Sequence, residues 1–115
     1  MTEFENLREQ LREFAAARDW DQFHSPKNLA MALSVEAGEL LETFQWLTEE
    51  QSRVLAPESL AAASDEIADV LLYLIRLSDK LGIDPIAAVN RKLLANAKKY
   101  PADKARGNSK KYTEL

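Results

Sequence analysis

The chain has 115 residues, which is enough for one hydrophobic core but not for two. Hydrophobic residues make up 46% of it and charged residues 30%, a composition typical of a folded globular protein rather than a disordered one. No cysteine is present, which excludes disulfide bonds, thiolate metal sites and cysteine nucleophiles. The formal net charge of −4 argues against nucleic acid as a partner, because nucleic-acid binding relies on neutralising backbone phosphates.

The sequence contains no segment typical of export or of membrane insertion. Residues 1–14 are charged throughout and hold no apolar signal-peptide core. The longest apolar run, residues 70–75, is far shorter than the roughly 20 residues that span a membrane. We therefore expect a soluble, cytoplasmic protein with no membrane partner.

We expect residues 1–115 to form a single domain in which about residues 101–115 are an irregular basic tail. Between Arg91 and Lys111 the chain has eight Lys or Arg residues and one acid, Asp103. Such a stretch on an acidic protein is either a phosphate-binding segment or a solvated C-terminus, and charge alone favours the solvated C-terminus.

Glycine and proline are scarce and fall where helices should begin or end. Three of the four predicted starts have a capping signal: Thr2 with Glu5, Ser25 with Pro26, and Asp84 with Pro85. Gly82 supplies a C-terminal stop. No stretch alternates with a strand period. The pattern predicts an all-α protein with helices over about residues 2–17, 26–46, 57–81 and 85–100, a loop over 18–24 and a helical turn over 48–55.

The predicted helix over residues 57–81 is apolar around nearly its full circumference. The residues responsible are Ile67, Ala68, Val70, Leu71, Leu72, Leu74, Ile75 and Leu77. A helix that is apolar all round needs partners on more than one side, and four short helices barely supply them. We therefore expect a homo-oligomer whose interface uses this helix; the alternative is the central helix of a monomeric bundle.

Two pairs of acids stand at helical spacing. Glu36 and Glu39 are three residues apart on one predicted helix, and Glu66 and Asp69 are three apart on the next long one. Residues three apart lie on the same helix face. An acid-rich helical protein produces such pairs by chance, so the spacing alone favours a solvated face.

The surroundings of the four acids shift this interpretation toward a metal site. Both pairs lie beside apolar residues, and no Arg or Lys lies within four residues of either. Repelling carboxylates in such a setting are costly without a cation, and Mg²⁺ takes oxygen ligands and is commonly shared with substrate phosphates. Gly38, between the two glutamates, removes a side chain and leaves room for a ligand or a neighbouring backbone. From the residues alone, the metal site and the solvated face are equally supported.

The arrangement E-x-x-E, then about 26 residues, then E-x-x-D resembles the MazG-like all-α nucleoside triphosphate pyrophosphohydrolases. The segments DWDQFHSPKNLAMALSVEAGELLETFQW, DEIADVLLYLIRL and KKYPADKARGNSKKYTEL resemble, more specifically, the dCTP pyrophosphatase branch of that superfamily. The likeness runs from about Phe14 to Leu115 and includes the aromatic loop and the C-terminal tail as well as the acids.

This resemblance implies a four-helix-bundle fold completed by homo-oligomerisation, as a homodimer or homotetramer. It implies Mg²⁺-dependent cleavage of a (deoxy)nucleoside triphosphate, dCTP or a modified dCTP, to the monophosphate and pyrophosphate, in house-cleaning of the nucleotide pool. The implied metal ligands are Glu36, Glu39, Glu66 and Asp69. The implied substrate-binding residues are Trp20, His24, Trp46 and Tyr73 for the base and Lys92 and Asn96 for the triphosphate or sugar.

One position departs from the animal enzymes of this branch, because Leu11 stands where they carry histidine. The preferred base is therefore left open. Physical reasoning supports the other roles in part, since a flat base stacks on an indole or phenol ring, but packing alone also explains a tryptophan or a tyrosine. A lone histidine, as His24 is here, is more often structural.

For the reaction, we expect Glu36 or Glu39 to act as the catalytic carboxylate that orients or deprotonates the attacking water. The charges of Lys92, Arg106, Lys110 and Lys111 would steady the leaving pyrophosphate if the tail folds over the site. Three other functions remain as alternatives: a dUTP-type or histidine-pathway pyrophosphohydrolase, a non-catalytic helical adaptor, and a nucleic-acid-binding regulator. The aromatic loop disfavours the first, and the net charge disfavours the last.

Overall fold

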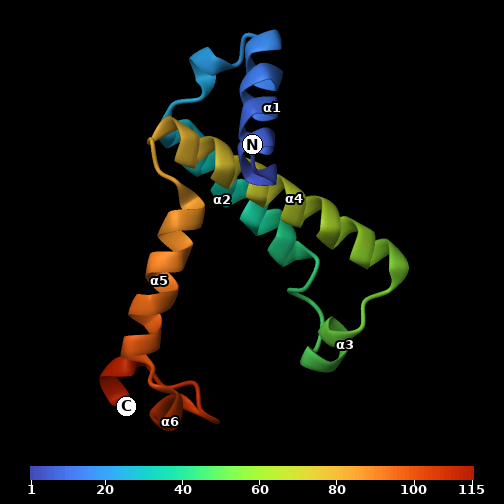
Figure 1. Ribbon diagram of the computed structural model, residues 1–115. Coiled ribbons are helices and arrows are strands. Elements are labelled where there is room, and N and C mark those ends of the chain that lie inside the picture. The colour runs from blue at the N-terminus through green and yellow to red at the C-terminus, as the bar shows by residue number, and fades with distance from the viewer. The chain divides into compact units, whose positions relative to one another are not determined.

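The computed structural model describes residues 1–115, and all of its regular elements are helices, which confirms the all-α prediction. The chain separates into two compact units, Met1–Gly82 and Ile83–Leu115 (Figure 1). The single domain expected over residues 1–115 stays a prediction. None of the helices combines the length and the apolar character that crossing a membrane requires.

The first unit is made of two long helices, a third that crosses them, and short helical segments between them. Its elements are α1 (Glu3–Ala17), the 3-10 helix η1 (Asp21–Phe23), α2 (Pro26–Glu42), α3 (Glu49–Arg53) and α4 (Pro57–Lys80). The expected capping box is present, since the Thr2 side chain accepts from the Glu5 backbone N–H and Glu5 bonds back to the Thr2 backbone. The Ser25 side chain caps α2 by accepting from the backbone N–H of Asn28.

α2 and α4 pack alongside each other in opposite directions, joined through α3, and α1 packs against α4 (Figure 1). Their buried hydrophobic residues are few: Leu29 of α2 is 1% exposed and Ile75 of α4 is 2% exposed, together with Ala15 and Ala63. The core of this unit is therefore the seam of α2 and α4 with one end of α1 against it.

A charged contact fixes α1 on α4. The Nε and Nη2 atoms of Arg12 donate to the two carboxylate oxygens of Asp79, the first at 2.7 Å. This paired geometry is the strong form of an arginine–carboxylate bond. The hydrogen bond from Arg12 is the main reason that the pKa of Asp79 lies below its ordinary value.

Helix α2 ends at Glu42, four residues before the predicted end at about Trp46. The backbone N–H groups of Thr43 and Phe44 bond three residues back, to Leu40 and Leu41, so the chain tightens into turns. No glycine or proline marks this change in the sequence. Trp46 is 87% exposed in the turn that follows, and no packing holds it in a longer helix.

The second unit contains α5 (Pro85–Lys99), α6 (Ala102–Ala105) and the 3-10 helix η2 (Tyr112–Glu114). The Asp84 carboxylate caps α5 by accepting from the N–H groups of Ile86 and Ala87. Residues 101–115, expected to be irregular, thus contain two short helical segments. An edge-to-face contact of Tyr100 with Tyr112, with centroids 6.0 Å apart, and Lys99 over the Tyr112 ring bring the end of the chain back onto α5.

Truncating the core should destabilise the first unit. Leu29→Ala removes a fully buried side chain from α2, and we expect it to lower the free energy of unfolding by about 2–5 kcal/mol. Val54→Ala, at a site 85% exposed, is the matched control and should change it by less than about 0.5 kcal/mol. Urea unfolding curves measure both; equal losses would contradict this placement of the core.

Candidate metal centre and the adjoining pocket

Three of the four predicted acids meet across the seam of α2 and α4. Glu36 and Glu39 lie one turn apart on α2, and Glu66 faces them from α4; the three carboxylates each place an oxygen within 4.8 Å of the others. The i, i+3 spacing puts the first two on one helix face, and the antiparallel packing supplies the third. These three residues are called the carboxylate cluster below.

The cluster lacks hydrogen-bond donors. The Oε2 atoms of Glu36 and Glu66 are inaccessible to solvent and have no hydrogen-bond partner. A buried polar atom without a partner is costly, and an ionised carboxylate more so. Either a proton shared between carboxyl groups or a cation would remove this cost.

The pKa values of two cluster residues show the effect of this crowding. The pKa of Glu36 is raised above its ordinary value, first by a hydrogen bond that its protonated form shares with Glu66, and then by burial. The pKa of Glu39 is also raised, first through hydrogen bonding with Glu36 and then by the negative charge of Glu36. The crowding of the carboxylates therefore disfavours the ionised forms of Glu36 and Glu39.

Asp69, the fourth predicted ligand, lies one turn beyond Glu66 on α4, outside the group of three whose oxygens meet. Its negative charge still contributes to the raised pKa of Glu36. Its side chain lines a neighbouring pocket, so Asp69 stands between the cluster and that pocket.

The cluster opens on its other side into a wide polar recess of about 580 Å³. Glu39 and Glu66 belong to its lining, together with Glu42, Thr43, Glu58, Ser59 and Ala62. A Cβ atom added at Gly38 would meet no atom within 4 Å, so packing within this chain does not exclude a small side chain there. The recess leaves the cluster accessible to a ligand from solvent.

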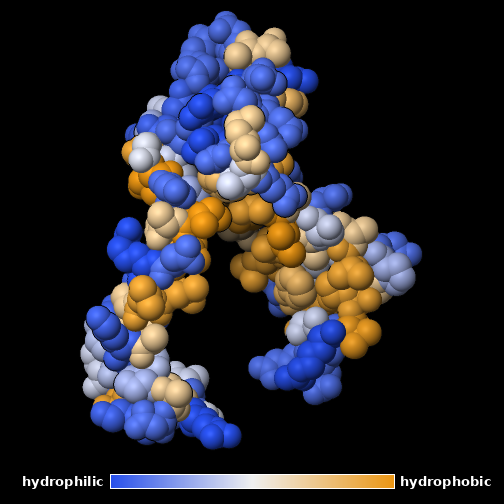
Figure 2. Space-filling model, viewed as in Figure 1, coloured by the Kyte–Doolittle hydropathy of each residue, from blue (hydrophilic) through white to orange (hydrophobic).

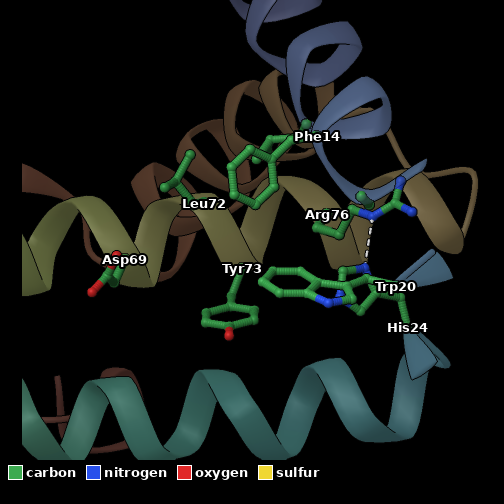
Figure 3. A pocket seen from close by; sticks show the side chains of 9 residues that line it. Phe14, Trp20, His24, Asp69, Leu72, Tyr73 and Arg76 are labelled. Carbon is green, nitrogen blue, oxygen red and sulfur yellow. Dashed lines mark hydrogen bonds between the residues drawn. The ribbon is translucent and has the colours of Figure 1, made fainter. Parts of the chain in front are cut away.

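The neighbouring pocket brings three of the four predicted base-binding residues together. Trp20, His24 and Tyr73 line a cavity of about 250 Å³ with Leu11, Phe14, Ala15, Asp69, Leu72 and Arg76 (Figure 3). Most whole-ligand pockets measure about 300–1,000 Å³, so this one suits part of a ligand, such as a single flat ring. Its walls are mainly apolar and aromatic.

Local contacts place the aromatic residues of this pocket. Trp20 precedes η1 and packs edge to face on Phe14 of α1, with ring centroids 5.7 Å apart. His24 follows η1, and its Nδ1 accepts a hydrogen bond from Nε of Arg76 at 3.2 Å (Figure 3). Tyr73 lies on α4 one turn beyond Asp69, as its spacing predicted.

Arg76 is the functional residue that the sequence did not indicate. It is 7% exposed and, besides His24, it donates to the Asp21 carboxylate from Nη2 at 2.6 Å. One signal was available, because Arg76 is the basic residue inside the apolar run of α4, seven residues after Asp69 on the same helix face. Its partners in the loop, His24 and Asp21, lie more than 50 residues away in the sequence, and no local pattern identifies them.

The remaining predicted site residues do not join this pocket. Trp46 is 87% exposed in the turn after α2. Lys92 and Asn96 lie exposed on α5, in the second unit, where Arg106, Lys110 and Lys111 also lie. Their roles at the triphosphate stay predictions.

The carboxylate cluster fits a hard divalent cation. It offers oxygen atoms from two helices, two of which are solvent-inaccessible without a hydrogen-bond partner, and no Lys or Arg pairs with any of the three acids. Oxygen ligands at an open site are what Mg²⁺ and similar ions take in proteins that bind phosphates.

Comparison with known proteins decides the family. Residues 31–115 match the MazG-like family. The chain belongs to the MazG-like family. This match contains α4 and α5 entirely and the part of α2 that carries Glu36 and Glu39.

Individual relatives of this MazG-like protein extend the likeness over nearly the whole chain. It is 46% identical to dCTP pyrophosphatase 1 of Homo sapiens and 44% identical to that of Mus musculus, over 113 residues, which are 96% of this chain and 66% of each relative. The crystal structure of a pyrophosphatase from Archaeoglobus fulgidus is similar with a TM-score of 0.79 and 43% identity, covering 88% of this chain and 94% of that one. The chain thus spans slightly less than two thirds of the length of these mammalian relatives.

The raised pKa values of Glu36 and Glu39 predict a pH dependence of stability in the absence of divalent metal. The ordinary pKa of a glutamate is about 4.5, and above that pH the unfolded chain has released protons that Glu36 and Glu39 still hold in the folded state. The two groups therefore lower the stability of the folded state as the pH rises. The glutamine in Glu36→Gln cannot ionise. The variant should therefore become increasingly more stable than wild type as the pH rises above that value. Asp79, whose pKa is lowered, raises stability as the pH rises, and it does so equally in wild type and in Glu36→Gln.

Thermal melts at stepped pH in a chelator measure this difference. Glu50→Gln, in α3 and paired with Arg53, serves as the control and should follow wild type at every pH. A gap between Glu36→Gln and wild type that stays constant with pH would contradict the shared protonation of the cluster.

Proposed function

We propose that this protein is a Mg²⁺-dependent nucleoside triphosphate pyrophosphohydrolase that converts dCTP, or a modified dCTP, to the monophosphate and pyrophosphate. The observation that carries the proposal is a carboxylate cluster with buried, unpartnered oxygens directly beside a pocket lined by aromatic rings. The carboxylate cluster suits a metal ion with bound phosphates, and the aromatic pocket suits a flat base. The name of the mammalian relatives, dCTP pyrophosphatase 1, supports the same reaction, and the name of the Archaeoglobus protein supports a pyrophosphatase in general.

Glu36, Glu39 and Glu66 would hold the ion, with Asp69 completing the set from the next turn of α4. When bound, Mg²⁺ would neutralise the charge that develops on phosphate oxygens as the bond between the α and β phosphates breaks. The recess beside Glu39 and Glu66 leaves room for the triphosphate to approach from solvent.

Glu39 is the best placed of the three to act on the attacking water. It is the most exposed residue of the cluster and borders the open recess, whereas Glu36 and Glu66 are partly buried. Glu39 would therefore accept the proton of the water.

The pocket beside the cluster would take the base. Trp20 and Tyr73 supply aromatic surface, and base–aromatic stacking contributes about 1–3 kcal/mol in proteins that bind single bases. Leu11 adds an apolar wall. The choice of dCTP over other pyrimidine triphosphates rests on the likeness to dCTP pyrophosphatase 1.

We also propose that the active protein is a homodimer or homotetramer. On α2, Met31 and Val35 lie on one face and are 56% and 60% exposed. On α4, Ile67 and Leu71 lie on one face and are 56% and 52% exposed. Figure 2 shows hydrophobic surface gathered over this pair of helices. Apolar faces of this extent favour association, and a second copy would cover them.

Product analysis tests the proposed activity. With Mg²⁺, dCTP should yield dCMP and pyrophosphate, and Glu39→Gln should reduce kcat by about 100-fold or more, because it removes the proton acceptor. Glu50→Gln, at a surface ion pair in α3, should retain wild-type activity. Release of inorganic phosphate instead of pyrophosphate, or undiminished activity of Glu39→Gln, would overturn the proposal.

Light scattering tests the oligomer. The native mass at micromolar concentration should be two or four times the chain mass of 13.0 kDa. Leu71→Asp places a charge in the proposed interface and should shift the mass toward the monomer, whereas Val54→Asp, 85% exposed beside α3, should not. A wild-type monomer would contradict the assembly without bearing on the carboxylate cluster.

A further inference from the structure

Arg76 is a buried charge whose contacts reach the loop of the base pocket. Its Nε donates to Nδ1 of His24 at 3.2 Å, and its Nη2 donates to Asp21 at 2.6 Å. Its Nη1 lies 3.5 Å from the carboxylate of Asp79, which Arg12 also holds. A buried guanidinium requires such partners, because an unpaired charge there would be strongly destabilising. Its place in α4 therefore fixes the position and the hydrogen bonding of the loop.

The contact with His24 determines which nitrogen of the imidazole carries the proton. Arginine stays protonated and has only donors, so Nδ1 of His24 has to accept. The remaining proton of the neutral ring is then on Nε2, which becomes a donor. Burial first, and the positive charge of Arg76 second, hold the pKa of His24 below its ordinary value; Lys80 acts in the same direction and Asp21 opposes them. These effects keep the ring neutral near pH 7.

We propose that Arg76 is a positioning residue that presents His24 to the pocket as a hydrogen-bond donor, and that this donor selects an acceptor atom on the edge of the bound base. A pyrimidine offers such atoms in its 2-carbonyl oxygen and, in cytosine, its unprotonated ring nitrogen. The opposite tautomer would present a lone pair, which repels these atoms. The identity of the ligand rests on the proposed function, whereas the assignment of the tautomer rests on the hydrogen bond from Arg76 to His24.

A comparison of Arg76 with Lys80 distinguishes control of the His24 tautomer from simple anchoring of the loop. Lys80 also holds Asp21 and so helps to anchor the loop, but the hydrogen bond to Nδ1 of His24 comes from Arg76. Loss of Lys80 should therefore loosen the loop without freeing Nδ1. Loss of Arg76 removes the donor to Nδ1 as well.

The nitrogen NMR spectrum of the imidazole tests the tautomer directly, because His24 is the only histidine in the chain. In the wild type at pH 7.5, we expect Nε2 to carry the proton and Nδ1 to be bare. Arg76→Met, which keeps an unbranched apolar side chain but donates nothing, should give a mixture of both tautomers, whereas Lys80→Gln should keep the wild-type pattern. A proton on Nδ1 in the wild type would overturn the proposal even if Arg76→Met does not fold.

Substitution of His24 tests the donor. With dCTP and Mg²⁺, His24→Ala should raise KM about tenfold with a smaller change in kcat, and His24→Gln, whose amide N–H lies near the position of Nε2, should restore most of the loss. The Nε2 signal of the wild type should move when dCTP is added. Equal impairment of both variants, or an unmoved Nε2 signal in a protein that hydrolyses dCTP, would overturn the donor role. Absence of hydrolysis with the predicted tautomer intact would instead contradict the proposed function.

Discussion

Repulsion among three carboxylates across the α2–α4 seam is the constraint on which the rest of the site depends. Glu36 and Glu66 bury oxygen atoms that no donor reaches, and Glu39 stands within the same small volume. Like charges this close destabilise the fold unless a proton or a cation intervenes. The seam that holds α2 and α4 together therefore also contains buried carboxylate oxygens without hydrogen-bond partners. Destabilising clusters of buried carboxylates of this kind are typical of functional sites, here a site that binds a metal ion.

A second polar group, built on Arg76, supports the other half of the site. The carboxylate cluster and the aromatic pocket share α4, where Glu66, Asp69, Tyr73 and Arg76 follow at intervals of three or four residues. Arg76 ties the loop after α1 to this helix, and Asp79 ties α1 itself through Arg12. One helix thus sets the spacing between the proposed metal centre and the proposed base pocket. A substitution that moves α4 would disturb both at once.

Most of the helices and the core of the site follow from local sequence patterns, and the rest depends on tertiary contacts. The caps at Thr2 and Ser25 and the proline starts located the helices, and i, i+3 spacing on antiparallel helices was enough to bring Glu36, Glu39 and Glu66 together. The end of α2 carries no breaker residue, so its early stop could not be predicted. The role of Arg76 could not be predicted either, because His24 and Asp21, to which it donates, belong to a loop far away in the sequence. Family resemblance suggested the nucleotide. The spacing of the acids alone favoured a solvated face, and their apolar surroundings made a metal site equally well supported.

The central claim is that the carboxylate cluster exists to bind a divalent cation. Anomalous diffraction from crystals grown with Mn²⁺, which carboxylate sites accept in place of Mg²⁺, tests it most directly. A peak bounded by the side chains of Glu36, Glu39 and Glu66, and absent from crystals of Glu36→Gln, is the predicted result. No peak at the cluster under saturating Mn²⁺, or a peak that persists in Glu36→Gln, would contradict the account.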